Sequence, residues 1–170
     1  MTMPILRLRN TEPTDLNFVL SAEADAENRP YIMTWSRQEH CQALERPNVA
    51  HLTIERVMEQ SPAAPVGYLI LVGLQDPNHS IQLRRIVVTD KGKGFGKQAI
   101  AQVKRLAFEV YQAHRLWLDV KPFNRHARNL YKSAGFVEEG MLRECFKSED
   151  GYGSLIIMSI LRSEYDAARG

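Results

Sequence analysis

Apolar and polar residues alternate at the start of the chain, and the spacing then changes to that of a helix. Residues Ile5–Arg9 alternate apolar with basic side chains, a pattern typical of a short edge strand. Thr14 and Asp15 stand at the position of an N-cap, before apolar residues at roughly helical spacing in Leu16–Ala24. The sequence therefore predicts a strand that leads into a first helix.

A turn-like, aromatic segment separates this helix from a second one. It runs from Glu27 to Trp35. Ser36 is followed three positions later by Glu39, and this pair forms a capping box that opens a short helix towards Leu44. The aromatic segment is therefore expected to be a loop between two helices.

Three β segments make up the middle of the chain, at 50–57, 66–74 and 80–88. Pro62 and Pro65 mark the first connection, and a turn at 76–78 marks the second. Both connections are short enough for antiparallel hairpins. The middle of the chain is therefore predicted to be a β meander.

The apolar spacing becomes helical again from Lys97. A period of 3.6 residues predicts a long helix that ends near His114, and Leu116–Val120 is then typical of a buried strand. With the strand before it, this helix forms a βαβ unit with parallel strands and a right-handed crossover. In a second unit Asn124 caps a helix that Gly135 ends. Two closing strands are expected at 136–143 and 154–161.

These elements predict an α+β fold with one mixed sheet, antiparallel early and parallel in the middle, and helices on both faces. The 170 residues are 44% hydrophobic and 25% charged, which excludes fibrous and disordered classes and indicates one domain over residues 1–170. A net charge of +2 is too small to indicate nucleic-acid binding. Cys41 and Cys145 form no C-x-x-C pair, and no apolar stretch approaches the ~20 residues of a membrane span. We therefore expect a cytoplasmic protein with free thiols and no membrane partner.

The segment Lys91–Gly96 combines glycines and lysines between a strand and a helix. Glycines allow successive backbone amides to face one ligand, and the helix N-terminus adds unpaired N–H groups, so the segment is suited to an anion. Lys91, Lys93 and Lys97 add positive charge. Neither the dinucleotide fingerprint nor the P-loop fits, because each needs a glycine where a lysine stands. The alternative is a flexible connection with solvated lysines.

With its flanks, the segment resembles the acetyl-CoA pyrophosphate loop of the GNAT N-acetyltransferase superfamily, Q/R-x-x-G-x-G/A. Lys91, Gly94 and Gly96 match it, with lysine in place of the usual Gln or Arg. A second match is Asn124-x-x-Ala-x-x-Leu-Tyr131, followed by Gly-Phe, which resembles the next helix of that family. The closing strands are similar to the ribosomal-protein and polyamine acetyltransferase branch.

The resemblance implies a fold and a set of cofactor-binding residues. It implies an acyl-CoA N-acyltransferase fold, in which the two central parallel strands splay apart. It further implies that acetyl-CoA is the co-substrate, and that the protein acetylates a primary amine of a small molecule or of a protein N-terminus. The residues that it assigns to acetyl-CoA are Ile86, Val87, Val88, Lys91, Gly92, Lys93, Gly94, Phe95, Gly96, Lys97 and Asn124.

Tyr131 and Asp119 are the candidate catalytic residues. The resemblance gives Tyr131 the role of general acid, and a phenol that is protonated at pH 7 suits it. Asp119, on the predicted parallel strand, is a candidate general base, because a buried carboxylate with a raised pKa can accept a proton. The alternatives are a packed tyrosine with a satisfied hydroxyl, an aspartate that pairs with a lysine or caps a backbone amide, and water as the base. Gln82 can only orient water or substrate.

The acceptor amine is expected near the aromatic loop and the last strands. Tyr31 and Trp35 are candidates for the wall of its pocket, although they can equally form a lid on the core. A strongly polycationic substrate finds no clear acidic cluster. The carboxylates near the predicted site in sequence are Asp119, Glu138, Glu139 and Glu144.

Other functions fit the sequence less well. The histidines show no metal-binding spacing, so no metal is expected. One alternative is a non-catalytic CoA-binding or acyl-CoA-sensing module, which Tyr131 argues against. Another is a nucleic-acid- or ribosome-binding protein, but the lysines around the glycine segment are better explained by CoA phosphates. We expect a monomer or a homodimer.

Overall fold

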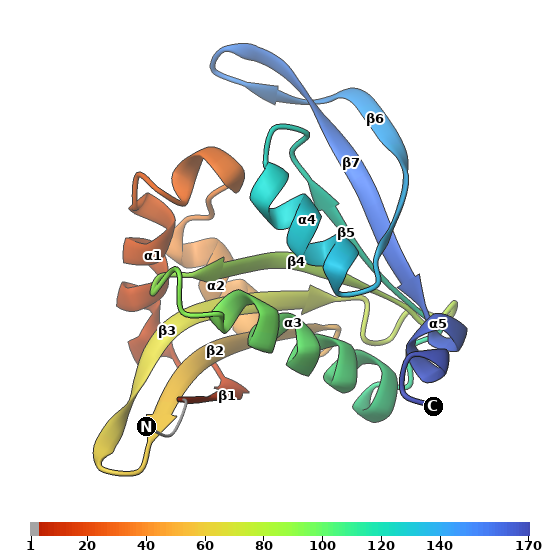
Figure 1. The fold of residues 1–170 in the computed structure, drawn as a ribbon. Coiled ribbons are helices and arrows are strands. Elements are labelled where there is room, and N and C mark those ends of the chain that lie inside the picture. The colour runs from red at the N-terminus through yellow and green to blue at the C-terminus, as the bar shows by residue number, and fades with distance from the viewer. Residues whose placement is uncertain (1–3) are drawn as a thin grey trace.

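A computed structural model describes residues 4–170, which form one seven-stranded mixed sheet (Figure 1). The strands are arranged in the order β1-β2-β3-β4-β5-β7-β6. Their bounds are β1 Ile5–Asn10, β2 Val49–Met58, β3 Ser61–Val72, β4 Ser80–Val88, β5 Arg115–Val120, β6 Val137–Ser148 and β7 Gly151–Leu161. The predicted mixed sheet is therefore confirmed.

Helices cover both faces of this sheet, as the sequence predicts. Their bounds are α1 Leu16–Ala24, α2 Arg37–Leu44, α3 Phe95–Arg105, α4 Arg125–Ser133 and α5 Arg162–Ala167. The first two lie on one face, and α3 and α4 lie on the other (Figure 1). No helix in the described part of the chain is long and apolar enough to cross a membrane.

The alternation of side chains along β3 separates the two cores. Tyr68 and Ile70 pack against α1, whereas Leu69 and Leu71 belong to the cluster that α3 covers. All four side chains are fully buried. An almost continuous apolar run is expected when a strand has helices on both of its faces.

A β-bulge interrupts this alternation in β4. Ile70 pairs with Arg85 and Leu71 pairs with Leu83, so Arg84 is the additional residue. Bulges bend a strand and redirect its side chains. As a result, Leu83 faces α3, whereas Arg85 faces the opposite side of the sheet. The sequence pattern shows no sign of this bulge.

The two central parallel strands separate at the same level. Pairing between β4 and β5 covers only three residue pairs, from Ser80 with Arg115 to Gln82 with Trp117. Beyond Gln82 the strands diverge, which agrees with the splay that the family resemblance implies. The splay opens the sheet between the end of β4 and the end of β5.

Several predicted boundaries are wrong. β2 and β3 continue almost to their turn, and Pro62 and Pro65 lie inside β3. They are tolerated because β4 pairs with β3 only from Gly67, so the proline-containing end has one neighbouring strand. After α3 the chain continues as a π-helical segment, Leu106–Val110, so the helical run ends at Val110 rather than near His114, since the chain turns at Gln112 with a φ of 54°.

The N-cap and the last strands also differ from the prediction. The Asp15 carboxylate does not cap α1; it accepts a hydrogen bond from the Glu12 amide (2.8 Å) and pairs with Arg9. β6 and β7 are longer than expected, and β7 lies between β5 and β6 in the sheet. The second crossover therefore joins strands that are not neighbours. The terminal helix α5 has no counterpart in the prediction.

Candidate active site

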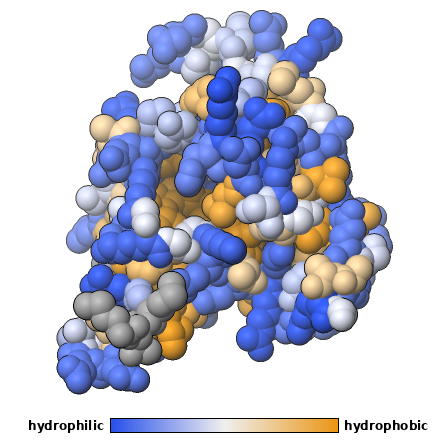
Figure 2. Space-filling model, in the orientation of Figure 1, coloured by the Kyte–Doolittle hydropathy of each residue, from blue (hydrophilic) through white to orange (hydrophobic). Residues whose placement is uncertain are grey.

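Two cavities adjoin at the splay between β4 and β5. The larger one has a volume of about 750 Å³ and is lined by the glycine segment, the end of β4 and the start of α4. The smaller one, of about 370 Å³, extends towards the aromatic loop and β5. Six residues line both: Tyr31, Ile32, Ile86, Asn124, Ala127 and Tyr131. Figure 2 shows apolar residues gathered in the middle of this face, between α1, α3 and α4.

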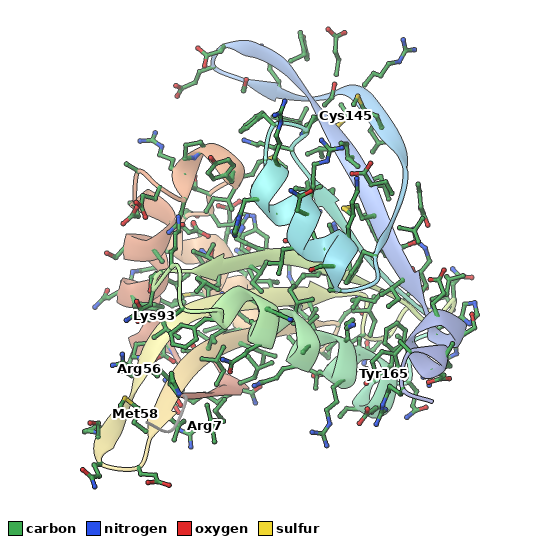
Figure 3. All side chains as sticks on the ribbon, in the orientation of Figure 1. Arg7, Arg56, Met58, Lys93, Cys145 and Tyr165 are labelled. Atoms are coloured by element: carbon green, nitrogen blue, oxygen red, sulfur yellow. The ribbon has the colours of Figure 1, made fainter. Side chains whose placement is uncertain are left out.

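Most residues assigned to acetyl-CoA line the larger cavity. These are Ile86, Val87, Val88, Lys91, Gly92, Gly94, Phe95, Gly96, Lys97 and Asn124. Lys93 does not: its ammonium lies 2.9 Å from Asp90, which Arg56 also approaches (Figure 3). The Phe95 side chain is buried in the core.

Two glycines adopt a left-handed backbone beside this cavity. Gly92 has a φ of 77°, and Gly94, the N-cap of α3, has a φ of 74°. A Cβ atom at either position meets no protein atom within 4 Å, so the space is open. The first amides of α3 therefore face a free volume with the positive end of a helix behind it. These features fit the pyrophosphate of a CoA molecule.

Asn124 lies where the two cavities meet. Its side-chain oxygen caps α4 by accepting a hydrogen bond from the Ala127 amide at 3.2 Å. This confirms the predicted helix start. The cap fixes the orientation of α4, and the same helix brings Tyr131 to the shared wall of the cavities.

Tyr131 is the only tyrosine of α4 and is almost completely buried, with 8% of its surface exposed. Within residues 4–170 its hydroxyl has no hydrogen-bond partner, so the alternative of a packed tyrosine with a satisfied hydroxyl does not hold. Burial and the charge of Asp119 raise its pKa. The phenol is therefore protonated throughout the neutral range, with its hydroxyl available to a ligand.

Asp119 extends from β5 into the smaller cavity. Its carboxylate accepts a hydrogen bond from the Gln82 side-chain amide at 3.0 Å. Burial raises the pKa of Asp119, and the charge of Arg84 and the bond from Gln82 oppose this shift. Among the described residues no lysine pairs with it, in contrast to the structural alternative drawn from the sequence. Gln82 therefore orients the carboxylate, which corrects the prediction that it orients only water or substrate.

The two aromatic candidates occupy different environments. Tyr31 is 44% exposed, lines both cavities and packs against Phe123, with 5.8 Å between ring centres. Trp35 lines only the smaller cavity, and the Arg85 guanidinium lies 4.7 Å from the centre of its ring. Both side chains therefore face a cavity, and the Trp35 ring also packs against the Arg85 guanidinium.

A buried polar network that the sequence reading missed supports this loop. Glu23, which is 2% exposed, accepts hydrogen bonds from Tyr68, from Arg85 (2.6 Å) and from the Trp35 amide (3.0 Å). Arg85 also donates to the Met33 carbonyl. Burial alone raises the pKa of Glu23, but hydrogen bonds from His40 and Tyr68 and the charge of Arg85 hold it below its usual value. The network ties both ends of the segment 33–35 to the core.

The hydrogen bonds continue from Glu23 through His40 of α2 to His51 of β2 and then to Thr11. His40 Nε2 lies 3.2 Å from Glu23, His40 Nδ1 lies 3.0 Å from His51 Nε2, and His51 Nδ1 lies 2.9 Å from the Thr11 hydroxyl. Because the Glu23 carboxylate can only accept, His40 donates from Nε2 and accepts at Nδ1, and His51 donates from Nε2. Thr11 then donates to His51, and Thr53 donates to Thr11. This pattern satisfies the donors and acceptors of the whole chain of hydrogen bonds.

Comparisons with known proteins identify the class of this site. Residues 16–136 match the model of the acetyltransferase (GNAT) family. The chain belongs to this family. It is an enzyme that transfers an acetyl group from acetyl-CoA to an amine, as the resemblance of its two motifs implies.

Individual relatives support the assignment. The chain is 30% identical over 167 residues to the spermidine N(1)-acetyltransferase of Vibrio cholerae serotype O1, covering 94% of this chain and 95% of the relative. An uncharacterized N-acetyltransferase of Bacillus subtilis, YokL, is 30% identical over 80 residues, 47% of this chain and 45% of the relative. The crystal structure of the Vibrio cholerae spermidine N-acetyltransferase in complex with CoA and spermine superimposes with a TM-score of 0.82 at 25% identity, covering 94% and 97% of the chains.

The sequence predicts Asp119 at the smaller cavity of this acetyltransferase, but not the cationic side chains there. Arg84, Arg85 and Lys121 line it together with Asp119. Two adjacent arginines in an otherwise apolar strand were the available sequence signal. No group of three or more His, Cys, Asp or Glu side chains suited to a metal occurs in residues 4–170.

Proposed function

We propose that this acetyltransferase binds acetyl-CoA in the larger cavity and a primary amine in the smaller one, and that the acetyl group passes directly between them. The amine belongs to a small molecule or to a protein N-terminus. The observation that carries this proposal is the position of Tyr131 in the wall that both cavities share, with Asp119 facing the smaller one. Holding two substrates in this way lowers the barrier by proximity.

The reaction needs two proton transfers. The amine nitrogen attacks the thioester carbonyl carbon, and its proton becomes acidic as the new C–N bond forms. The Asp119 carboxylate accepts this proton. The C–S bond then breaks, and the Tyr131 hydroxyl donates a proton to the departing sulfur. Asp119 passes its proton to solvent and Tyr131 regains one, so the enzyme returns to its starting state without a covalent intermediate.

The environments of the two residues suit these opposite roles. The raised pKa of Asp119 makes its carboxylate a stronger base than an exposed aspartate, and the hydrogen bond from Gln82 keeps it oriented. The raised pKa of Tyr131 keeps the proton on the phenol until a strong base appears. The phenol therefore keeps its proton at neutral pH, and the carboxylate accepts a proton more readily than an exposed aspartate does.

We also propose that the enzyme works in the cytoplasm. Cys41 and Cys145 are both free and exposed, and Cys145 lies on the β6–β7 hairpin (Figure 3). Free surface thiols are typical of a reducing compartment. This supports the expectation from the sequence.

Release of CoA thiol from acetyl-CoA in the presence of an amine panel tests the function. The panel contains spermidine, simple alkylamines, amino acids and short peptides. In the native enzyme, kcat/KM is expected to rise with pH through the raised pKa of Asp119, because only the ionised carboxylate accepts a proton. Asp119→Asn is expected to lower kcat/KM by about 10²-fold and to remove this acidic limb.

Asp150→Asn, in the exposed turn after β6, is the matched control and is expected to retain both the rate and the limb. An Asp119→Asn enzyme with native rate and native pH profile would assign the proton to solvent instead. The absence of thiol release with every amine, by a protein that binds CoA, would favour the non-catalytic CoA-binding module.

A further inference from the structure

The smaller cavity has an unusual charge for a site that receives an amine. Among the described residues that line it, Asp119 is the only carboxylate, whereas Arg84, Arg85 and Lys121 are cationic. Glu23 neutralises Arg85 through a buried ion pair at 2.6 Å. Two cations therefore remain for one carboxylate, and that carboxylate is needed for the amine. Resting on the proposed function, we propose that the acceptor carries a carboxylate besides its amine.

Arg84 is the first of the two cations available to such a group. It is the additional residue of the β4 bulge. The bulge interrupts the alternation of side chains along the strand and leaves Arg84 exposed. Its side chain is exposed at the mouth of the cavity, and its one hydrogen bond within the described chain is a long contact of 3.5 Å to the Gln82 oxygen. A guanidinium with free donors matches the two oxygens of a carboxylate.

Lys121 is the second cation, and it follows β5 directly. Its ammonium donates to the Pro30 carbonyl at 2.8 Å and lies 5.9 Å from the centre of the Phe123 ring. Its side chain is partly buried, and this burial lowers its pKa. No carboxylate pairs with it in residues 4–170. Two of its three donors remain for an anion, at the side of the cavity that Tyr31 lines.

This arrangement disfavours a polycation. A diamine that places one nitrogen at Asp119 brings its second ammonium towards Arg84 or Lys121, where like charges repel. A carboxylate at the same distance from the amine is attracted to both. The acceptor chemistry is therefore an amine and an anion in one molecule, either a small amino acid or an acidic N-terminal peptide.

Matched amines that differ only in charge test the proposal. The probes are α- and ω-amino acids of increasing length, the corresponding amides, and the diamines of the same length, with spermidine included. A second set consists of peptides with Asp or Asn at the second position, which separates a peptide source from a small molecule. The best carboxylate probe is expected to exceed its amide and its diamine in kcat/KM by about tenfold or more.

Variants of Arg84 connect this preference to the site. Arg84→Gln is expected to lower kcat/KM about tenfold more for the carboxylate probe than for the amide, whereas Arg84→Lys retains part of the preference. Arg84→Glu is expected to shift the preference towards the diamine. Arg46→Gln, an exposed arginine outside both cavities, is the control and keeps native values for all probes. Unchanged CoA affinity shows that each variant is folded.

The failure of this proposal differs from failure of the proposed function. Acetylation of diamines or spermidine as efficiently as of the carboxylate probes would overturn the anionic acceptor while leaving the transferase activity established. A preference for carboxylates that Arg84→Gln does not change would also overturn the role of this cavity. If no probe of any charge is acetylated, the proposed function itself fails.

Discussion

At the scale of single residues, Tyr131 combines a buried ring with a hydroxyl that faces the two cavities. A buried phenol normally finds a hydrogen-bond partner, because an unsatisfied polar group is costly. Tyr131 has none within the described chain, and its hydroxyl instead reaches the wall between two cavities. In the proposed mechanism, the partner of this hydroxyl is the thioester sulfur of the bound acetyl-CoA.

Replacement of Tyr131 by phenylalanine tests this assignment. Tyr131→Phe retains the ring that packs against Phe136, and removes only the proton donor. The raised pKa makes the phenol a weaker acid than a CoA thiol. The rate enhancement expected from Tyr131 as general acid is therefore at the low end of the usual range. We expect kcat to fall about 10²-fold with an unchanged Kd for CoA, measured by thiol release and by titration calorimetry. A fully active variant would show that the thiolate leaves without protonation by the enzyme.

Individual site residues differ in how far the sequence predicts them. Tyr131 and Asn124 belong to a motif with fixed spacing, and Asp119 precedes it on a strand whose end is easy to locate. Arg84 and Lys121 have no motif, because their role depends on a bulge in β4 and on the splay between strands. Glu23 lies in a helix, and its partners come from distant parts of the chain, up to 62 positions away.

At the scale of elements, the start of α3 is the part of the site that depends most on backbone conformation. Gly94 caps this helix with a φ of 74°, and its Cα faces open space. For a residue with a side chain, the left-handed region costs about 1–2 kcal/mol. An added side chain also projects into the volume assigned to the pyrophosphate. Strain and obstruction are separable effects.

Gly94→Val and Gly151→Val separate them. Gly151, the first residue of β7, has a φ of 124° and equally open surroundings, but lies outside both cavities. Both variants are expected to lose stability by about 1–2 kcal/mol. At a hundred times its Kd, CoA is expected to stabilise the native protein and Gly151→Val by about 2.7 kcal/mol. Gly94→Val is expected to lose this protection, as measured by thermal unfolding. Equal protection of both variants would contradict the role of the glycine segment.

The elements themselves were largely predictable, with errors where tertiary contacts decide. β4 begins and ends where its apolar run does, and Ser36 and Asn124 cap their helices as their side chains indicate. β3 extends through two prolines because only one neighbouring strand pairs there. Insertion of β7 between β5 and β6 depends on long-range pairing that no local pattern records.

At the scale of the whole molecule, the acceptor side of the site is supported by the helical layer on the opposite face of the sheet. Glu23 of α1 and His40 of α2 meet Arg85 and Tyr68 of the central strands in one buried network. Arg85 faces this network because of the bulge that places Arg84 at the cavity. The segment that carries Trp35 is therefore held by both layers, and the condition of the network affects the stability of the entire fold.

The free energy of unfolding is expected to decrease in acid because of this network. Burial, together with the charges of His40 and Arg85, lowers the pKa of His51 from 6.5 to about 4. Between these values the unfolded chain binds a proton that the folded protein does not. The free energy of unfolding is therefore at its full value above pH 6.5, and decreases as the pH falls towards 4, by about 3 kcal/mol for this residue.

Urea unfolding at pH 7, 5.5 and 4.5 measures this dependence. His51→Gln is expected to be less stable at pH 7, because its bonds to His40 and Thr11 are disturbed, but to lose less stability between pH 7 and 4.5 than the native protein. His114→Gln removes an exposed histidine outside the network and is expected to retain the native slope. If His51→Gln keeps the native slope as well, the acid sensitivity comes from other groups. His51 then does not limit the stability of the fold in acid.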